Sequence, residues 1–465
     1  MFKKIFILYF VIGFTALVGC EDMIEIEAPL DQVVAEDVFK SDATAKSALS
    51  GLYGTFSQSQ TQLQNLTVNL ALAADELEYY QTVATYIEFA TNTYLPSNGN
   101  VSGMFSDYYA AIYKANSLIE GVAQGSVTPA LATRITAEAK FLRAYCYFHL
   151  VNLFGRIPLV LETDVNVTSI LPRSNPDVIY EQIIRDLTEA RADLAADYAV
   201  STGSRVVPNK AAADAMLARV YLYTGADDLA EAAASSVIDQ TALYTLVPQG
   251  NLATDVFSRD NKEAIMQFMG WGVSTNLYTY EASVLIPSSF ATTATFGLSN
   301  DLIDAFGPDD ARRNAWITQV IKEGVTYNIP YKYKNLTSTT VVAAGEYPTI
   351  LRLAEQYLIR AEARARIGTN IASALADLNA IRTRAGLTES STTDATALLD
   401  EIAEERRKEL FLELGHRWFD LKRTGKIDDA LNPIKPDWES TAALLPIPQA
   451  AVDANPALLP NNPGY

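Results

Sequence analysis

Residues 208–225 read PNKAAADAMLARVYLYTG, and residues 227–239 continue with DDLAEAAASSVID. Both stretches carry apolar and small residues at helical spacing, and Gly225 between them suits the left-handed turn that ends many helices. A comparable unit recurs as ILRLAEQYLIRAEARARIG (350–368), followed by the helical pattern IASALADLNAIRTRAG (371–386). When Gly225 is aligned with Gly368, Ala218 falls on Ala361, which places small residues where paired helices approach. The repeat predicts tetratricopeptide-like helix pairs, whose apolar faces become buried only when the pairs stack.

Helical spacing extends over most of the remaining chain. Residues 37–56 predict a helix with Ser41 as its N-cap, and residues 104–122 predict another that stops at Gly121. The stretch RITAEAKFLRAYCYFHLVNLF (134–154) is apolar around most of its circumference, so we expect a helix that is buried between neighbours and ends at Gly155. Together these patterns predict a mostly α-helical fold, with about four helix pairs in a superhelical scaffold.

One segment departs from this pattern. From residue 251 to residue 348 the helical period is lost, the chain is rich in Thr, Ser, Gly, Pro and Tyr, and short β-like runs appear, such as AIMQFMGW (264–271) and YNIPYKY (327–333). We expect a loop-rich inserted region with short strands, carried on the helical scaffold, where binding residues are commonly found. The predicted division is a signal peptide (1–19), an N-terminal helical region (20–250), a ligand-binding insertion (251–348) and a C-terminal helical region with a tail (349–465).

The start of the chain predicts a lipid anchor. Lys3 and Lys4 precede fifteen uncharged residues, Ile5 to Gly19, a run that suits a signal peptide and is too short to span a bilayer. LVGC (17–20) resembles the lipobox of bacterial lipoproteins, in which the cysteine, here Cys20, receives the lipid. The acidic pair after Cys20 is similar to the surface-export signal of Bacteroidetes lipoproteins. The alternative is a secretory signal that ends in a chance cysteine.

The amino-acid composition argues against several classes of binding partner and of catalytic or metal site. The formal net charge is −19, which disfavours nucleic acid as the main partner because like charges repel. The chain has two cysteines, and Cys146 lies in an apolar helical pattern, so we expect a buried thiol and no disulfide. The two histidines, His149 and His416, are far apart in sequence and belong to no HExxH motif. We therefore expect neither a metal site nor a cofactor, and His149 reads as a core residue.

The most highly charged motif, EERRKELFLELGHRWFDLKR (404–423), resembles an active site at first sight. Helical spacing places Glu404 over Lys408 and Arg406 over Glu409, pairs that we expect on a solvated face. Gly415 suits the left-handed turn at the end of this helix. The motif is therefore interpreted as structural.

Several stretches together resemble one family. They are AEAKFLRAYCYFHLVNLFGRIPLV (137–160), LRLAEQYLIRAEARARIG (351–368), IAEERRKELFLELGHRWFDLKRTGK (402–426) and the tail LLPIPQAAVDANPALLPNNPGY (444–465). In order and placement they resemble the SusD/RagB family of outer-membrane lipoproteins, although Ala450 and Ala451 stand where that family usually has an acidic residue after PIPQ. The resemblance implies a non-enzymatic subunit on the outer face of the outer membrane. It would capture an oligosaccharide and close as a lid over a SusC-like TonB-dependent transporter.

A sugar ring has apolar C–H faces and a rim of hydroxyls, so we expect aromatic side chains with nearby polar groups at its site. Two stretches supply this mixture, residues 73–100 and residues 268–282. Trp271 is the first candidate because Gly270 and Gly272 flank it and would let the ring stand clear of the backbone. The other candidates are Tyr94, Tyr80 and Asp75, with Tyr278 and Tyr280 as a wall. The alternative for each tyrosine is an ordinary role in the core.

Other functions stay open at this stage. A peptide could replace the sugar as ligand, since some members of the family resemble peptide-uptake subunits. The helix pairs could also serve as an interaction scaffold with no small ligand. A glycoside hydrolase needs only two suitably spaced carboxylates, and 55 acidic residues are present.

Overall fold

The structure is a computed structural model that describes residues 38–58, 63, 65–273, 276–287, 294–337 and 339–465. Cys20 and the predicted signal peptide lie outside the described residues. Among the described residues, no helix combines the length and the apolar character needed to cross a membrane.

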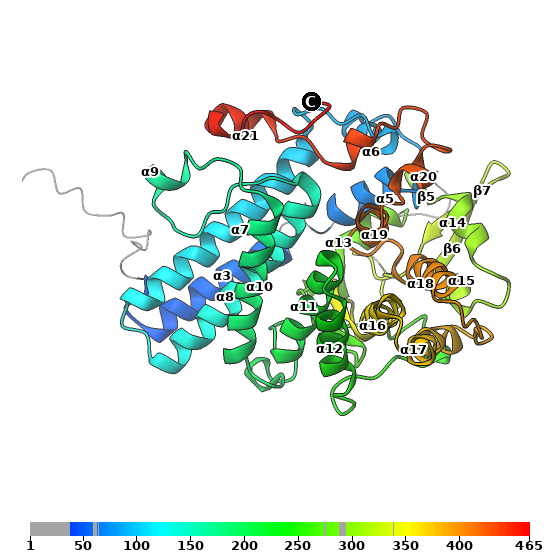
Figure 1. The fold of residues 1–465 in the computed structure, drawn as a ribbon, viewed down its shortest axis with the longest axis horizontal. Helices are drawn as coiled ribbons and strands as arrows, with labels where there is room; N and C mark the ends of the chain where they lie inside the picture. Colours follow the sequence, from blue (N-terminus) through cyan, green and yellow to red (C-terminus); the bar gives the residue numbers. More distant parts are fainter. Residues whose placement is uncertain (1–37, 59–62, 64, 274–275, 288–293, 338) are drawn as a thin grey trace, which may run out of the picture.

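The scaffold is a continuous row of helices in which each packs against the next (Figure 1). Figure 1 shows the row passing from α3, α7 and α8 on the left, through α10 to α12, to α16, α17 and α18 on the right. The predicted mostly α-helical fold of helix pairs is confirmed. The row comprises α3 (Asp42–Gln58), α7 (Gly99–Gln124), α8 (Pro129–Phe154), α10 (Pro176–Asp193), α11 (Lys210–Thr224), α12 (Asp227–Ile238), α16 (Leu353–Ile367), α17 (Ile371–Arg384) and α18 (Ala395–Leu410).

The glycine turns explain the two most similar pairs. Gly225 between α11 and α12 and Gly368 between α16 and α17 both have φ of +74°, a conformation that glycine adopts readily because it has no Cβ. Small residues line the contact between these pairs, where Ala218 and Ala363 share one buried cluster. The helices can therefore approach closely. Ala361, which the alignment places on Ala218, is also fully buried, but in the cluster that α16 forms with α17 and α18.

Helix α7 differs from its prediction at one end. The helix runs through Gly121 and ends at Gln124, so the prediction of a stop at Gly121 is wrong. A Cβ at this position would lie 2.1 Å from the ring of Phe39. Gly121 therefore serves close packing and not chain reversal.

The long helix α8 follows its prediction. It is buried on most sides and ends at Gly155, which has φ of +68°. Cys146 is buried and free, and His149 is buried with its Nδ1 2.9 Å from the carbonyl oxygen of Tyr145. Burial lowers the pKa of His149 to about 3, so the imidazole is neutral in the core.

In the described part of the chain, four short antiparallel strand pairs complete the fold, and two of them join the segment 251–348 to other regions. Leu77 of β1 pairs with Leu298 of β5, and Ala264 of β2 pairs with Arg352 of β8. The other two pairs are hairpins within that segment. The strands are β1 (Leu77–Tyr79), β2 (Ala264–Gln267), β3 (Trp271–Val273), β4 (Asn276–Tyr278), β5 (Phe296–Leu298), β6 (Ile317–Lys322), β7 (Val325–Pro330) and β8 (Thr349–Arg352).

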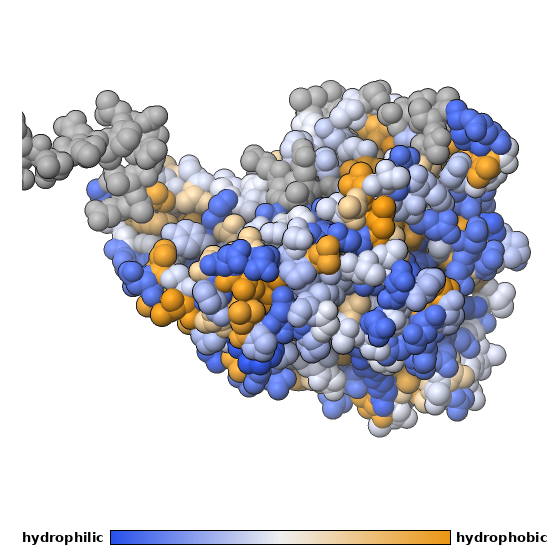
Figure 2. All heavy atoms as spheres, turned by 90° about the horizontal axis from the view of Figure 1, so that it is seen from above, coloured by the Kyte–Doolittle hydropathy of each residue, from blue (hydrophilic) through white to orange (hydrophobic). Residues whose placement is uncertain are grey.

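Short helices connect these parts. They include α5 (Leu70–Ala73), α6 (Ala84–Thr91), α9 (Val165–Thr168), α13 (Tyr280–Leu285), α14 (Asn300–Ala305), α15 (Ala311–Trp316), α19 (His416–Arg423), α20 (Ile427–Leu431) and α21 (Gln449–Ala454). Figure 1 places α9 and α21 at the upper side of the molecule. Seen from above, that side carries separate hydrophobic patches among hydrophilic residues (Figure 2).

The charged motif at 404–423 is largely buried, contrary to expectation, although Glu404 is exposed. Glu405, Arg406 and Glu409 are all buried, because α18 packs between α16, α14 and α19. Glu409 does not pair with Arg406 but with Arg312, Arg352 and Arg384. Helix α18 ends at Leu410, and Gly415 precedes α19 instead of ending α18. Helical spacing alone suggested ion pairs within α18, but the ion-pair partners of its buried charges come from distant segments of the chain.

A buried ion network connects the segment 251–348 to the helical scaffold. Arg352 at the end of β8 donates to Glu263, Glu409 and Glu413. Lys332 donates to Glu413, and its Nζ lies 4.0 Å from the ring centroid of Phe411. Every charge named here has an opposite charge or a ring face in contact, which offsets the loss of hydration.

Candidate functional site on the insertion

The predicted first candidate lies on a β-hairpin. Trp271 of β3 and Tyr278 of β4 are directly opposite each other, and both side chains are partly exposed. Gly270 allows a close backbone approach, since a Cβ there would lie 2.3 Å from the carbonyl oxygen of Glu346. Gly272 has φ of +100°, which favours glycine. The glycines thus shape the hairpin on which the two aromatic residues face each other across the strands.

Helix α13 follows the hairpin directly and adds a third aromatic residue. The Thr279 hydroxyl accepts from the backbone N–H of Ala282 and caps the helix. Tyr280 at the first position of α13 is partly exposed. The next residue, Glu281, points into the interior, and burial raises the pKa of its carboxyl to about 7.

Tyr80 brings the early part of the chain to this region. Its hydroxyl donates to Glu78 Oε2 at 2.8 Å. Its ring packs edge-to-face against the ring of Tyr327, with 5.1 Å between the two ring centroids. Both rings pack on a buried cluster that contains Ala282 of α13 and Ile329 of β7. The early segment therefore meets α13 and β7 of the insertion. Two groups of rings are together called the aromatic face below: Trp271, Tyr278 and Tyr280 on the hairpin and the start of α13, and Tyr80 and Tyr327 on the cluster that includes α13.

Two other predicted residues lie inside the protein. Tyr94 is 2% exposed, and its hydroxyl accepts from Asn92 Nδ2 at 2.8 Å. Asp75 is 6% exposed and accepts two hydrogen bonds from Arg417, at 2.8 and 2.7 Å. Burial opposes the charge of Asp75, but the Arg417 hydrogen bonds hold its pKa below the usual value. Neither side chain presents a surface to a ligand in this structure.

Sequence reasoning missed Tyr327 as a member of the aromatic face. The run YNIPYKY was recognised as β-like, but nothing in it indicates which tyrosine points outward. Tyr327 becomes a candidate only because β7 lies beside β5, which pairs with the strand preceding Tyr80. Alternation along β7 is the signal that could have suggested it, since alternate residues face opposite sides.

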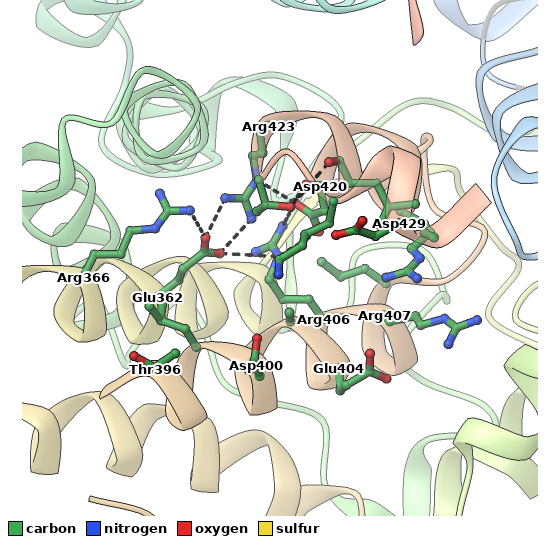
Figure 3. Close-up of a pocket in the computed structure, with 18 of the residues that line it drawn as sticks. Glu362, Arg366, Thr396, Asp400, Glu404, Arg406, Arg407, Asp420, Arg423 and Asp429 are labelled. Atoms are coloured by element: carbon green, nitrogen blue, oxygen red, sulfur yellow. Dashed lines mark hydrogen bonds and ion pairs between the residues drawn. The ribbon is translucent and has the colours of Figure 1, made fainter. Parts of the chain in front are cut away.

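A second concave site lies among α16, α18, α19 and α20 (Figure 3). It is a groove of about 810 Å³, and the motif at 404–423 supplies much of its wall. Figure 3 shows Glu362 at the centre of a network with Arg366, Arg406 and Arg423. Asp420 bonds Arg406 and Arg423 as well. None of the described residues that line this groove is aromatic.

The ionisable groups at the aromatic face and at the groove indicate which ligands and chemistry each site could support. Within the described part of the chain, no group of three or more His, Cys, Asp or Glu side chains is placed to hold a metal ion. The Glu76 carboxyl at the groove is buried beside Asp75, and burial raises its pKa to about 8. The aromatic face offers ring surfaces together with the hydroxyl of Tyr80 and the carboxylate of Glu78, a combination suited to binding.

Comparisons with known proteins agree with this architecture. A family model described as "SusD family" matches residues 299–465, and one described as "Starch-binding associating with outer membrane" matches residues 26–222. SusD-like protein P2 of Formosa agariphila is 28% identical over 98% of this chain and 99% of its own. The starch-binding protein SusD of Bacteroides thetaiotaomicron is 28% identical over 68% of each chain. The solved structure of a laminarin-binding SusD-like protein is 25% identical, with a TM-score of 0.75 over 92% of this chain and 100% of its own.

Proposed function

The chain belongs to the SusD/RagB family, and from this premise we propose that it captures oligosaccharides on the aromatic face without covalent chemistry. The observation that carries the proposal is the hairpin that sets Trp271 opposite Tyr278, next to the partly exposed Tyr280. Flat rings complement the C–H faces of a sugar, and the Glu78 carboxylate beside Tyr80 can accept from hydroxyls.

The partner and the location follow from the family and from the start of the chain. We propose that Cys20 carries the lipid, that the protein faces the exterior of the outer membrane, and that it closes over a SusC-like TonB-dependent transporter. A rigid-body movement of this kind needs no change in the helix pairs themselves. The support is the lipobox-like LVGC and a family model whose description names association with the outer membrane.

One observation favours a second candidate, a peptide ligand. The groove in Figure 3 combines arginines, carboxylates and aliphatic side chains such as Leu399 and Leu421, and lacks aromatic lining among its described residues. Such a surface suits a peptide with charged groups better than a sugar ring.

Affinity electrophoresis tests the proposal directly. The chain without residues 1–20 is run in gels that contain one neutral or anionic polysaccharide each. We expect retardation in at least one neutral glycan, and loss of that retardation in Trp271→Ala. Tyr113→Ala is the matched control, because Tyr113 is 52% exposed on α7, away from the aromatic face.

The outcomes separate the candidates. Retardation that survives Trp271→Ala would contradict the aromatic face as the site. Absence of retardation in every glycan, together with binding of short charged peptides, would favour the second candidate. Release of reducing sugar from a retarding polysaccharide would contradict the proposal that the protein does no covalent chemistry.

A further inference from the structure

The loop between α8 and α10 displays an unusual set of aliphatic side chains. Val165 is 65% exposed and Ile170 is 67% exposed, and Leu161 and Val167 are each 39% exposed. Asn455 Nδ2 donates to the carbonyl oxygen of Leu171, which brings the C-terminal tail against this loop. Figure 2 shows hydrophobic atoms on the left half of the upper side, the half that carries α9 and α21 in Figure 1. Exposed aliphatic side chains gathered in one short loop mark it as a candidate interaction site.

The loop is held firmly at its base. Asn116 of α7 donates to the carbonyl oxygen of Val160 at 3.0 Å, and Tyr147 of α8 donates to the same oxygen at 2.7 Å. Glu120 of α7 accepts from the backbone N–H of Thr163 at 3.0 Å and from its hydroxyl. The scaffold therefore presents the aliphatic tip in one orientation, so its exposure is a property of the folded loop.

Helix α7 connects the loop to the point where the described chain begins. The described residues start at Val38, and the ring of Phe39 packs against Gly121, the neighbour of Glu120 on α7. The backbone N–H of Ser126 donates to the carbonyl oxygen of Phe39 at 2.9 Å. Cys20 precedes Val38 by eighteen residues, which span at most about 65 Å when extended. A lipid on Cys20 thus keeps this end of the molecule within reach of a bilayer.

We propose that the aliphatic loop, defined as residues 161–170, inserts into the surface of a lipid bilayer as a second contact beside the predicted lipid anchor. The proposal rests on the proposed anchor only for the direction from which the membrane approaches. Side chains of this kind bind a membrane by burying apolar area at the boundary between head groups and acyl chains. Two weak contacts together orient a protein that a single point of attachment would leave free to rotate.

The charges around the loop specify the kind of surface. Residues 161–170 contain Glu162 and Asp164 and no lysine or arginine. The loop itself therefore offers no cation to anionic head groups, and the contact depends on apolar burial. We expect binding to zwitterionic phosphatidylcholine vesicles that anionic lipid weakens and that salt does not abolish.

The experiment uses the chain without residues 1–20, which retains every described residue. An environment-sensitive dye is attached to Asn166→Cys, and the control label is at Val200→Cys. Cys146 is fully buried, so each variant is labelled at one site. With phosphatidylcholine vesicles we expect a blue shift of the dye emission at position 166 and no shift at position 200.

Co-sedimentation with the same vesicles supplies an independent measurement. Val165→Asp/Ile170→Asp should lower the bound fraction about ten-fold, because it removes two of the exposed aliphatic groups and adds charge. The matched control is Val325→Asp/Ile321→Asp, since these residues are 52% and 67% exposed on the hairpin β6–β7. Equal binding by both double variants, or no blue shift at position 166, would overturn the proposal. Glycan retardation is measured on the same variants, so a failure here is distinguishable from a failure of the proposed function.

Discussion

At the scale of single residues, Arg352 shows how buried charge is used in this protein. Its guanidinium contacts Glu263, Glu409 and Glu413, which come from two distant parts of the chain. A buried ion pair contributes little compared with a well-packed apolar pair, but the loss of one partner leaves uncompensated charge. Arg352 therefore contributes to stability mainly because its removal would leave buried carboxylates with less compensating charge.

We expect Arg352→Met to lower the free energy of unfolding by about 3–5 kcal/mol. Each carboxylate keeps at least one other cation, so the fold should survive: Arg384 remains with Glu263, Arg312 and Arg384 with Glu409, and Lys332 with Glu413. Urea denaturation followed by circular dichroism measures the change. Lys140→Met is the control, because its partner Glu189 is exposed and such pairs contribute about 0–1 kcal/mol. Equal changes in the free energy of unfolding for the two substitutions would show that the buried network stabilises the protein no more than an exposed ion pair.

The buried carboxyl of Glu281 leads to a prediction about how stability depends on pH. Burial raises the pKa of its carboxyl from 4.5 to about 7. Between these values the folded protein keeps a proton that the unfolded chain has released, so this group's contribution becomes more unfavourable to folding as pH rises. Glu281→Gln removes that contribution and should stabilise the protein relative to wild type, by on the order of 3 kcal/mol above pH 7 and little below pH 4.5.

The measurement is urea denaturation of wild type and Glu281→Gln across this pH range. Comparison of the two proteins cancels the effects of other buried carboxyls, including Glu76. The exposed Glu439→Gln is the control and should follow wild type at every pH. A constant difference between wild type and Glu281→Gln would contradict the assignment.

The candidate residues show where sequence reasoning stops at this scale. Trp271 stood out because glycines flank it, and the structure places it on a partly exposed hairpin. Tyr94 and Asp75 carried no comparable local signal, and both are buried. The partner of Asp75 is Arg417, which lies 342 positions further along the chain. Composition identifies a residue type suited to binding, whereas exposure depends on tertiary contacts that the local sequence does not contain.

At the scale of elements, local sequence signals were sufficient to predict the helices. Apolar spacing and glycine turns predicted the pairs α11–α12 and α16–α17, because both signals act within a few residues. The strands were harder to predict, since β1 and β8 are three and four residues long and pair with partners far away in sequence. Residues 350–352, read as the start of a helix, form part of β8 for this reason.

The glycine turns yield a prediction about these pairs. Gly225→Ala and Gly368→Ala should each lower stability by about 1–2 kcal/mol, because both positions have φ of +74°. Gly225 has open space around it, so the effect would come from the backbone alone. Thermal denaturation measures the change. Gly250→Ala is the control, as that site is also open and does not have a positive φ. Similar values for all three variants would contradict the interpretation.

At the scale of the whole molecule, the segment 251–348 is anchored to the helical scaffold by strands and by charge. β2 pairs with β8 at the start of α16, and Arg312 contacts Glu405 and Glu409 of α18. The buried core also includes Trp316 from the segment and Phe411 from the C-terminal region. We infer that the segment is not an independently folding unit.

Unfolding should therefore occur in one transition. Far-ultraviolet circular dichroism reports on the helices, and tryptophan fluorescence includes Trp316 and Trp271 of the segment. We expect the urea midpoints from the two signals to coincide in wild type. A fluorescence transition that precedes the loss of helix would show that the segment unfolds on its own.

The contacts of Asp75 and β1 also affect the order in which the protein is made. The ribosome releases residues 75–79 long before β5 (296–298) and Arg417, with which they pair. Until then the nascent chain has an unpaired strand edge and an uncompensated carboxylate, and cannot complete its core. Local helices can form early, but the final fold depends on the last fifty residues. A chain that must wait for its end to fold remains open to chaperones throughout synthesis.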